Sequence, residues 1–144
     1  ISDAYYDGRT ICIFRLSDVI LCKAEIENNL NGPAAALPYL NQIRARAGAP
    51  EYGKHNRFPA PSTKEAMNDA ILKERGYELV FEFQRRADLI RFGKYEEVVN
   101  AHLKKLGIAQ PTNVTSSLRY FPYPLNDAQL NPNLAAENPS RLPK

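Results

Sequence analysis

Residues 74–92, which read ERGYELVFEFQRRADLIRF, place carboxylates and apolar side chains on opposite faces of one helical register. Glu74, Glu78 and Glu82 form a row at successive i+4 positions. Like charges at this spacing destabilise an isolated helix by a few tenths of a kcal/mol per pair, so the row predicts cations from elsewhere. A separate stripe at helical spacing consists of Leu72, Gly76, Leu79, Val80 and Phe83.

Arginines that could neutralise the row lie in several segments. Arg85 and Arg86 follow Glu82 by three and four residues, and other arginines lie in two further segments with apolar periodicity: Arg44, Arg46 and Arg91. We therefore predict that arginine and carboxylate side chains join packed helices. Arg44 or Arg46 should lie within ion-pairing distance of the Glu74 and Glu78 carboxylates.

Length and charge limit the functional classes. The 144 residues suit one domain. The net charge is only +3, and the basic residues alternate with acidic ones instead of forming a block, which argues against a nucleic-acid surface. No apolar run approaches the length of a membrane span. The chain begins at Ile1 without an initiator Met or an apolar leader, which predicts a processed protein or a piece of a longer one.

Metal and catalytic patterns are absent from the sequence. Cys12 and Cys22 do not have the paired spacing of a zinc site, and the sequence favours small buried thiols over a disulfide. Neither His55 nor His102 follows a Glu at the spacing of a helical diiron site. Carboxylates four residues apart on one helix stand side by side, whereas a glycosidase needs two that face each other across a cleft. We expect no enzyme activity, metal or cofactor.

Apolar periodicity predicts five helices. The first, Arg15 to Leu30, has two overlapping apolar stripes and should be buried on more than one side. Gly32 ends it, and a second helix with apolar residues from Ala36 to Ala47 returns as a hairpin; Pro38 requires that this helix start late or kink. The others are a third from a Ser62–Glu65 capping box to about Phe81 or Phe83, a fourth at 85–92 and a fifth at 96–106.

The remaining segments read as irregular structure. Residues 49–62 have no periodicity and are predicted to form an exposed loop. Residues 108–144 are rich in Pro and Asn, with apolar side chains that predict an extended strap across the helices: Leu118, Tyr120, Phe121, Tyr123 and Leu125. The expected fold is all-α, one domain over 1–144, with an N-terminal edge at 1–14, helical hairpins at 15–107 and the strap at 108–144.

Five segments carry a family resemblance, in order along the chain: RLSDVILCKAEIENN at 15–29, LNQIRARAG at 40–48, ILKERGYELVFEFQRRADLIRFGKY at 71–95, YFPYPLNDAQLNPNL at 120–134 and ENPSR at 137–141. Together they resemble the C-terminal part of the SusD/RagB family of surface glycan-binding lipoproteins. The sequence departs from the family pattern at Phe83, where Gly is common after Glu, at Ser140, where Gly is usual, and at Pro38.

The resemblance implies tetratricopeptide-like hairpins at the outer surface of a Gram-negative bacterium. It implies that the protein passes oligosaccharides, or sometimes peptides, to a TonB-dependent outer-membrane transporter without catalysis. The lipidated Cys and an N-terminal part would lie outside this chain. The resemblance also implies that the matched charged residues belong to the framework and not to the ligand platform: Arg44, Arg46, Glu74, Arg75, Glu78, Arg86, Asp88 and Arg91.

Two functional readings follow. Sugar binding uses aromatic faces, for which Tyr5, Tyr6 and Tyr52 are the candidates, although each also fits a scattered surface aromatic. The alternative is a purely structural interaction module whose helical hairpins contact another protein and bind no ligand of their own. The sequence does not identify the glycan.

Overall fold

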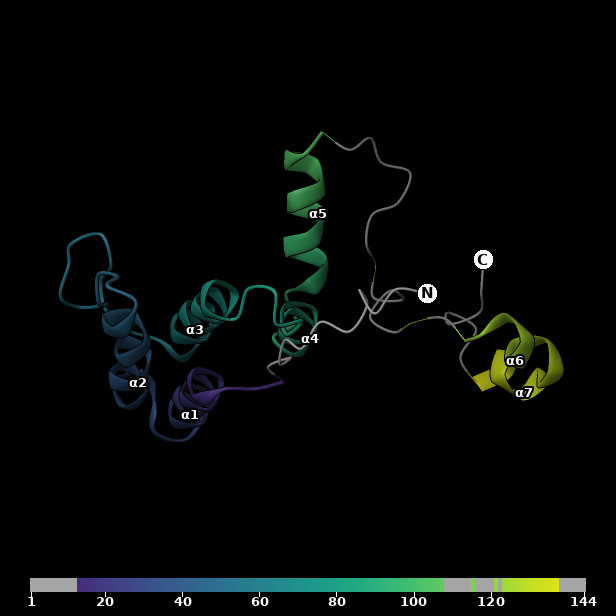
Figure 1. Cartoon of the computed structure of the whole chain (residues 1–144), viewed down its shortest axis with the longest axis horizontal. Helices are drawn as coiled ribbons and strands as arrows, with labels where there is room; N and C mark the ends of the chain where they lie inside the picture. Colours follow the sequence, from purple (N-terminus) through teal and green to yellow (C-terminus); the bar gives the residue numbers. More distant parts are fainter. Residues whose placement is uncertain (1–12, 108–114, 116–120, 122, 138–144) are drawn as a thin grey trace, which may run out of the picture. The chain divides into compact units, whose positions relative to one another are not determined.

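The computed structural model describes residues 13–107, 115, 121 and 123–137, and these residues form an all-α structure (Figure 1). The predicted fold class is confirmed. Within the described ranges the only β-type pairing is an isolated bridge between His55 and Phe58. The chain divides into two compact units between Asp88 and Leu89, and each unit is described by itself.

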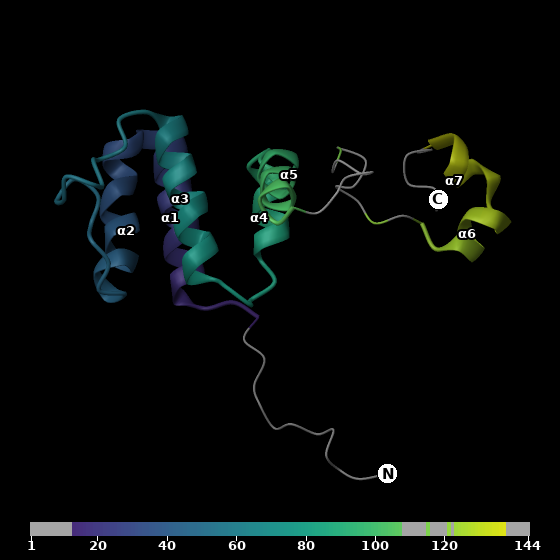
Figure 2. The ribbon, with the colours of Figure 1, turned by 90° about the horizontal axis from the view of Figure 1, so that it is seen from above.

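Three packed helices form most of the first unit, which ends at Asp88 in the next helix: α1 (Leu16–Asn31), α2 (Pro33–Arg46) and α3 (Lys64–Glu78). The predicted hairpin joins α1 to α2, since Gly32 turns the chain with a φ of 90° and Pro33 suits the first position of a helix. α3 packs against both, as Figure 2 shows. The largest fully buried apolar side chains of this core are Leu21, Leu40, Ile43, Met67 and Ile71.

α1 buries one face only, so the prediction that it is buried on more than one side is wrong for the described residues. The face that packs on α2 and α3 contains Ser17, Leu21, Ala24 and Asn28. Most of the predicted stripes lie on the other side, where exposed fractions range from 56% to 74% for Leu16, Val19, Ile26 and Leu30. The buried face of α1 is the one that contains the small residues Ser17 and Ala24, because small side chains let neighbouring helices approach closely.

Pro38 lies inside α2, which begins at Pro33, so the alternative that this helix starts late is wrong and the alternative of a kink stays a prediction. Proline has no N–H, so the hydrogen bond to the carbonyl of Ala34 is missing from the helix. Both residues are exposed, so water can reach that carbonyl. The helix therefore tolerates the defect at its surface.

The limits of α3 differ from the prediction at both ends. Its N-cap is Thr63, whose side chain accepts a hydrogen bond from the Ala66 N–H, so Ser62 and Glu65 do not form a capping box. The helix ends at Glu78 and not at Phe81 or Phe83, because those phenylalanines have φ values of 64° and 61°. This left-handed conformation cannot continue an α-helix. Both phenyl side chains are almost fully exposed, at 92%.

Replacing Phe83 by Gly is expected to stabilise the chain. A left-handed conformation costs a bulky residue about 1–2 kcal/mol, and glycine avoids this cost at an entropic penalty of about 0.5–1 kcal/mol. Urea unfolding should therefore show a gain of about 0.5–1 kcal/mol in Phe83→Gly. Val80, which is exposed in the same turn without a positive φ, provides the control, since Val80→Gly should destabilise. Equal destabilisation by both variants would contradict the left-handed turn.

The rest of the described chain contains four short helices: α4 (Arg85–Arg91), α5 (Tyr95–Lys105), α6 (Leu125–Leu130) and α7 (Pro132–Glu137). The predicted fourth and fifth helices correspond to α4 and α5, which are followed by Gly93 and Gly107 with φ values of 70° and 66°. No helix in the described ranges has the length and apolar character needed to cross a bilayer.

The C-terminal segment is largely helical over residues 125–137. Residues 125–137 form α6 and α7, which contact each other, so the strap prediction is wrong for this stretch. Phe121 and Leu125 are exposed and Tyr123 is half-buried, whereas Leu118 and Tyr120 lie outside the described residues.

Candidate functional site

A buried ion pair joins the end of α2 to the C-terminal half of α3. Arg44 Nη1 lies 2.6 Å from Glu74 Oε2, and both side chains are only 5% exposed. The Arg44 Nε donates a second hydrogen bond, of 2.7 Å, to the Pro50 carbonyl. The guanidinium also lies over the rings of Tyr52 and Phe58, 4.6 and 4.7 Å from their centroids. Arg44 therefore connects both helices to the loop that follows α2.

A second buried arginine connects α1, α3 and α4. Arg75 lies 2.8 Å from Asp88 and 2.8 Å from Asp18, and its Nη1 also donates to the Cys22 thiol at 3.6 Å. Burial alone would lower the pKa of Arg75, but its hydrogen bonds and charge interactions with the two aspartates outweigh burial and raise it. The side chain thus stays charged.

Cys22 is half-buried and unbridged, in line with the predicted small buried thiol, while Cys12 lies outside the described residues. Burial raises the pKa of the Cys22 thiol, against the opposing effect of Arg75. A thiol with a raised pKa is a poor nucleophile at neutral pH.

Glu78, the second residue of the acidic row, is the last residue of α3 and is paired with two arginines. Its carboxylate bonds to Arg15, which precedes α1, and to Arg46 at the end of α2. Arg15 also holds Glu82 at 2.8 Å, although Glu82 lies beyond the end of α3. The Glu78 side chain is 7% exposed, while that of Arg46 is 61% exposed. Each carboxylate of the row therefore has a cation.

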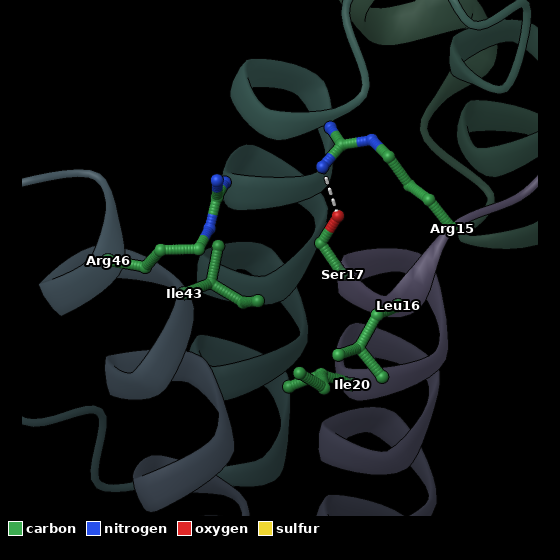
Figure 3. Close-up of a pocket in the computed structure, with 6 residues that line it drawn as sticks. All are labelled: Arg15, Leu16, Ser17, Ile20, Ile43 and Arg46. Carbon is green, nitrogen blue, oxygen red and sulfur yellow. Dashed lines mark hydrogen bonds between the residues drawn. The ribbon is translucent and has the colours of Figure 1, made fainter. Parts of the chain in front are cut away.

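The same arginines line a small pocket of about 200 Å³ (Figure 3). Figure 3 shows Arg15 extending from the segment before α1 and Arg46 from the end of α2, with Arg15 bonding to the Ser17 hydroxyl. Apolar side chains make up much of the remaining wall: Leu16, Ile20 and Ile43. Since both arginines are already paired with carboxylates, the pocket offers a ligand little uncompensated charge.

Glu78 should make stability depend on pH. Burial would raise its pKa, but hydrogen bonds from Arg15 and Ser17 and the charges of Arg15 and Arg46 outweigh burial and lower it. A carboxyl group with a lowered folded-state pKa stabilises the fold above its unfolded value of about 4.3, and this contribution is lost as the pH falls through the folded value. In urea unfolding, Glu78→Gln should destabilise the chain more at about pH 7 than at about pH 3. A difference that does not change with pH would contradict this pairing.

Gly76 leaves room for a further arginine of the cluster. Arg85 Nη1 donates to the Leu72 carbonyl at 2.8 Å, and a Cβ at position 76 would lie 2.8 Å from the same nitrogen. Arg85 thus bonds to the backbone of α3 and not to Glu82, the partner that its spacing suggested. A larger residue at position 76 would displace the Arg85 side chain.

The structure brings together six of the eight charged residues singled out from the sequence: Arg44, Arg46, Glu74, Arg75, Glu78 and Asp88. Of the other two, Arg91 lies over the Phe92 ring at 4.6 Å, and Arg86 is engaged by neighbouring groups. Sequence reasoning missed Arg15 and Asp18. We call the paired groups of the first unit the charge lattice, which consists of Arg15, Asp18, Arg44, Arg46, Glu74, Arg75, Glu78, Glu82 and Asp88.

Of the three tyrosines that the sequence offered for sugar binding, only one lies in the described part of the structure. Tyr5 and Tyr6 lie outside the described residues. Tyr52 is half-buried and anchored by Asn41, which accepts from the Tyr52 N–H at 2.8 Å and donates to its carbonyl at 2.9 Å. The predicted loop is therefore exposed over most of its length but fixed at Tyr52.

The lattice carboxylates are held in ion pairs, and none of them lines the pocket of Figure 3. Among the described residues, no group of three His, Cys, Asp or Glu side chains has the arrangement to hold a metal ion. The geometry supports a connecting role for these charges.

The profile of the SusD family matches residues 1–140. The chain belongs to the SusD family. Among curated SusD relatives, it is 39% identical to SusD-like protein P25 of Formosa agariphila, over 83% of this chain and 22% of that protein. It is 28% identical to the starch-binding protein SusD of Bacteroides thetaiotaomicron, over 94% of this chain and 22% of that protein. This SusD family chain thus spans about a fifth of the length of these relatives. No solved structure gives a significant match.

Proposed function

We propose that this chain is the C-terminal portion of a SusD-like lipoprotein that binds glycans at the outer surface of a Gram-negative bacterium. It works there with a TonB-dependent transporter and contributes mainly scaffold and partner contacts. Its similarity to a starch-binding protein supports glycan as the ligand class of the whole protein. The carrier role requires no catalysis.

The observation that carries the scaffold role is the charge lattice. Arg44, Glu74, Arg75 and Asp88 are nearly inaccessible to solvent, so a ligand could reach them only if the helices separated. Their hydrogen bonds join the helices of the first unit. We infer that they fix the geometry of the hairpins.

Exposed apolar side chains favour the second candidate function, a protein-interaction module. Leu16 and Leu30 on the outer face of α1 are exposed, as are Phe81 and Phe83 in the turn after α3. Monomeric proteins rarely leave extensive apolar surface in water, so such surface fits contact with another protein or another part of the same one. Partner contact and glycan carriage are compatible in one protein.

Affinity purification from the native host tests the proposal. The tagged protein should be recovered from the outer-membrane fraction together with a TonB-dependent barrel, and it should retain oligosaccharides on a glycan array. Recovery from the cytoplasm without a barrel would reject the proposal. Recovery with a barrel but without any glycan retention would favour the pure interaction module.

A further inference from the structure

A surface pocket of about 470 Å³ lies between the loop after α2 and the first half of α3. The loop contributes Tyr52 and Phe58 to its wall, and α3 contributes Ala66 and Asp69. This volume falls within the range of small-molecule sites in proteins. The pocket is separate from the one in Figure 3, and no residue of the charge lattice lines it.

The two aromatic rings in this wall are held in place before any ligand arrives. The ring centroids of Tyr52 and Phe58 are 5.8 Å apart with an edge-to-face angle of 88°. Backbone hydrogen bonds fix the loop between them, from Gly53 N–H to the Phe58 carbonyl at 2.7 Å and from Phe58 N–H to the His55 carbonyl at 2.8 Å. A fixed aromatic surface binds at a lower entropic cost than a mobile one.

Arg44 covers part of each ring, so only the remaining ring surface can contact a ligand. Its buried guanidinium lies over Tyr52 and Phe58, so one face of each ring is covered by protein. Both residues are nevertheless half-buried and line the pocket. The ring surface away from Arg44 is therefore the part that faces a ligand.

Polar side chains around the rings supply hydrogen-bonding groups. Arg57 and Lys73 are exposed donors on the pocket wall, and Asp69 adds an acceptor. Apolar ring faces bordered by donors and acceptors suit a sugar, whose C–H surface stacks on an aromatic ring while its hydroxyls hydrogen-bond. With two cations and one carboxylate, the wall also favours a sugar that carries an acidic group.

We propose that this pocket is an oligosaccharide subsite, in which one ring of the perpendicular Tyr52 and Phe58 pair stacks on a sugar ring while the other contacts its edge, and Arg57, Asp69 and Lys73 bind its polar groups. The choice of sugar as the ligand class rests on the proposed function, while the position of the subsite rests on the geometry. This subsite lies in the portion of the protein that is otherwise scaffold.

Protein-observed NMR titration of the 144-residue chain with maltoheptaose and with trigalacturonic acid tests the subsite. Saturable shifts are expected at the Gly53 and Ala66 amides, with trigalacturonic acid binding more tightly. Ala66→Trp places a large side chain in the pocket from α3 without altering the aromatic pair, and should weaken binding about tenfold or more. Lys73→Gln should weaken binding of trigalacturonic acid more than binding of maltoheptaose.

Ala34→Trp is the matched control, because Ala34 is exposed on α2 and does not line this pocket. It should leave the affinity within about twofold of the parent chain. Unchanged binding in Ala66→Trp, or no shift with either probe, would overturn the subsite. If the native protein then still co-purifies with a TonB-dependent barrel and retains glycan, the proposed function stands and only the subsite fails.

Discussion

Replacing Glu74 by Gln is expected to destabilise the chain by about 3–5 kcal/mol, because it leaves the Arg44 charge buried without a counter-ion. Arg44 is 4% exposed as a whole residue, so water cannot replace the lost carboxylate. Glutamine keeps the size of the side chain, which separates the effect of charge from that of a cavity. Urea unfolding followed by circular dichroism measures the change.

An exposed pair and a double variant are the controls for this result. Glu51 pairs with Lys54, whose side chain is 70% exposed, so Glu51→Gln should cost under about 1 kcal/mol. Combining Glu74→Gln with Arg44→Met removes the unpaired charge and should recover part of the loss. A Glu74→Gln variant no less stable than Glu51→Gln would show that the pair is solvated in solution.

Replacing Arg75 by Met is expected to have a similar cost, about 3–5 kcal/mol, because two carboxylates lose the same partner. Asp88 is 3% exposed and the Asp18 side chain is 16% exposed, so most of the penalty should come from Asp88. Methionine preserves much of the side-chain volume and its apolar packing. Thermal and urea unfolding should both show the loss.

Arg57→Met provides the comparison for Arg75, since Arg57 is an exposed arginine outside the lattice. It should change stability by less than about 0.5 kcal/mol. Adding Asp88→Leu to Arg75→Met should restore part of the stability by removing a buried carboxylate that has lost its ion pair with Arg75. No recovery in the double variant would indicate that Arg75 stabilises the fold through its alkyl chain alone.

Helical periodicity was sufficient to predict the all-α class and the hairpin of α1 and α2, because both depend on residues close together in sequence. It also predicted that arginines would meet the acidic row, and Arg44 and Arg46 do reach Glu74 and Glu78. Repulsion within a row of like charges requires a nearby counter-charge, which is why the row was informative.

Ion-pair partners that lie far apart in the sequence could not be predicted from helical periodicity. Arg15 lies before the first helix and pairs with Glu78 and Glu82, more than 60 residues away, so no spacing rule connects them. The end of α3 was also missed, because Val80 and Phe83 continue an apolar pattern that the backbone abandons after Glu78. The sequence feature that could have indicated this end was position 83, where the family commonly has glycine and where the structure has a φ of 61°.

The unequal depth of the lattice determines how it responds to dissolved salt. Counter-ions screen exposed charges within about 8 Å at physiological ionic strength but screen buried pairs much less. Arg46 is open to water, whereas Arg44 is enclosed. At high ionic strength the ion pair of Arg46 with Glu78 therefore weakens first, while the buried pair of Arg44 and Glu74 keeps its attraction and continues to hold α2 against α3.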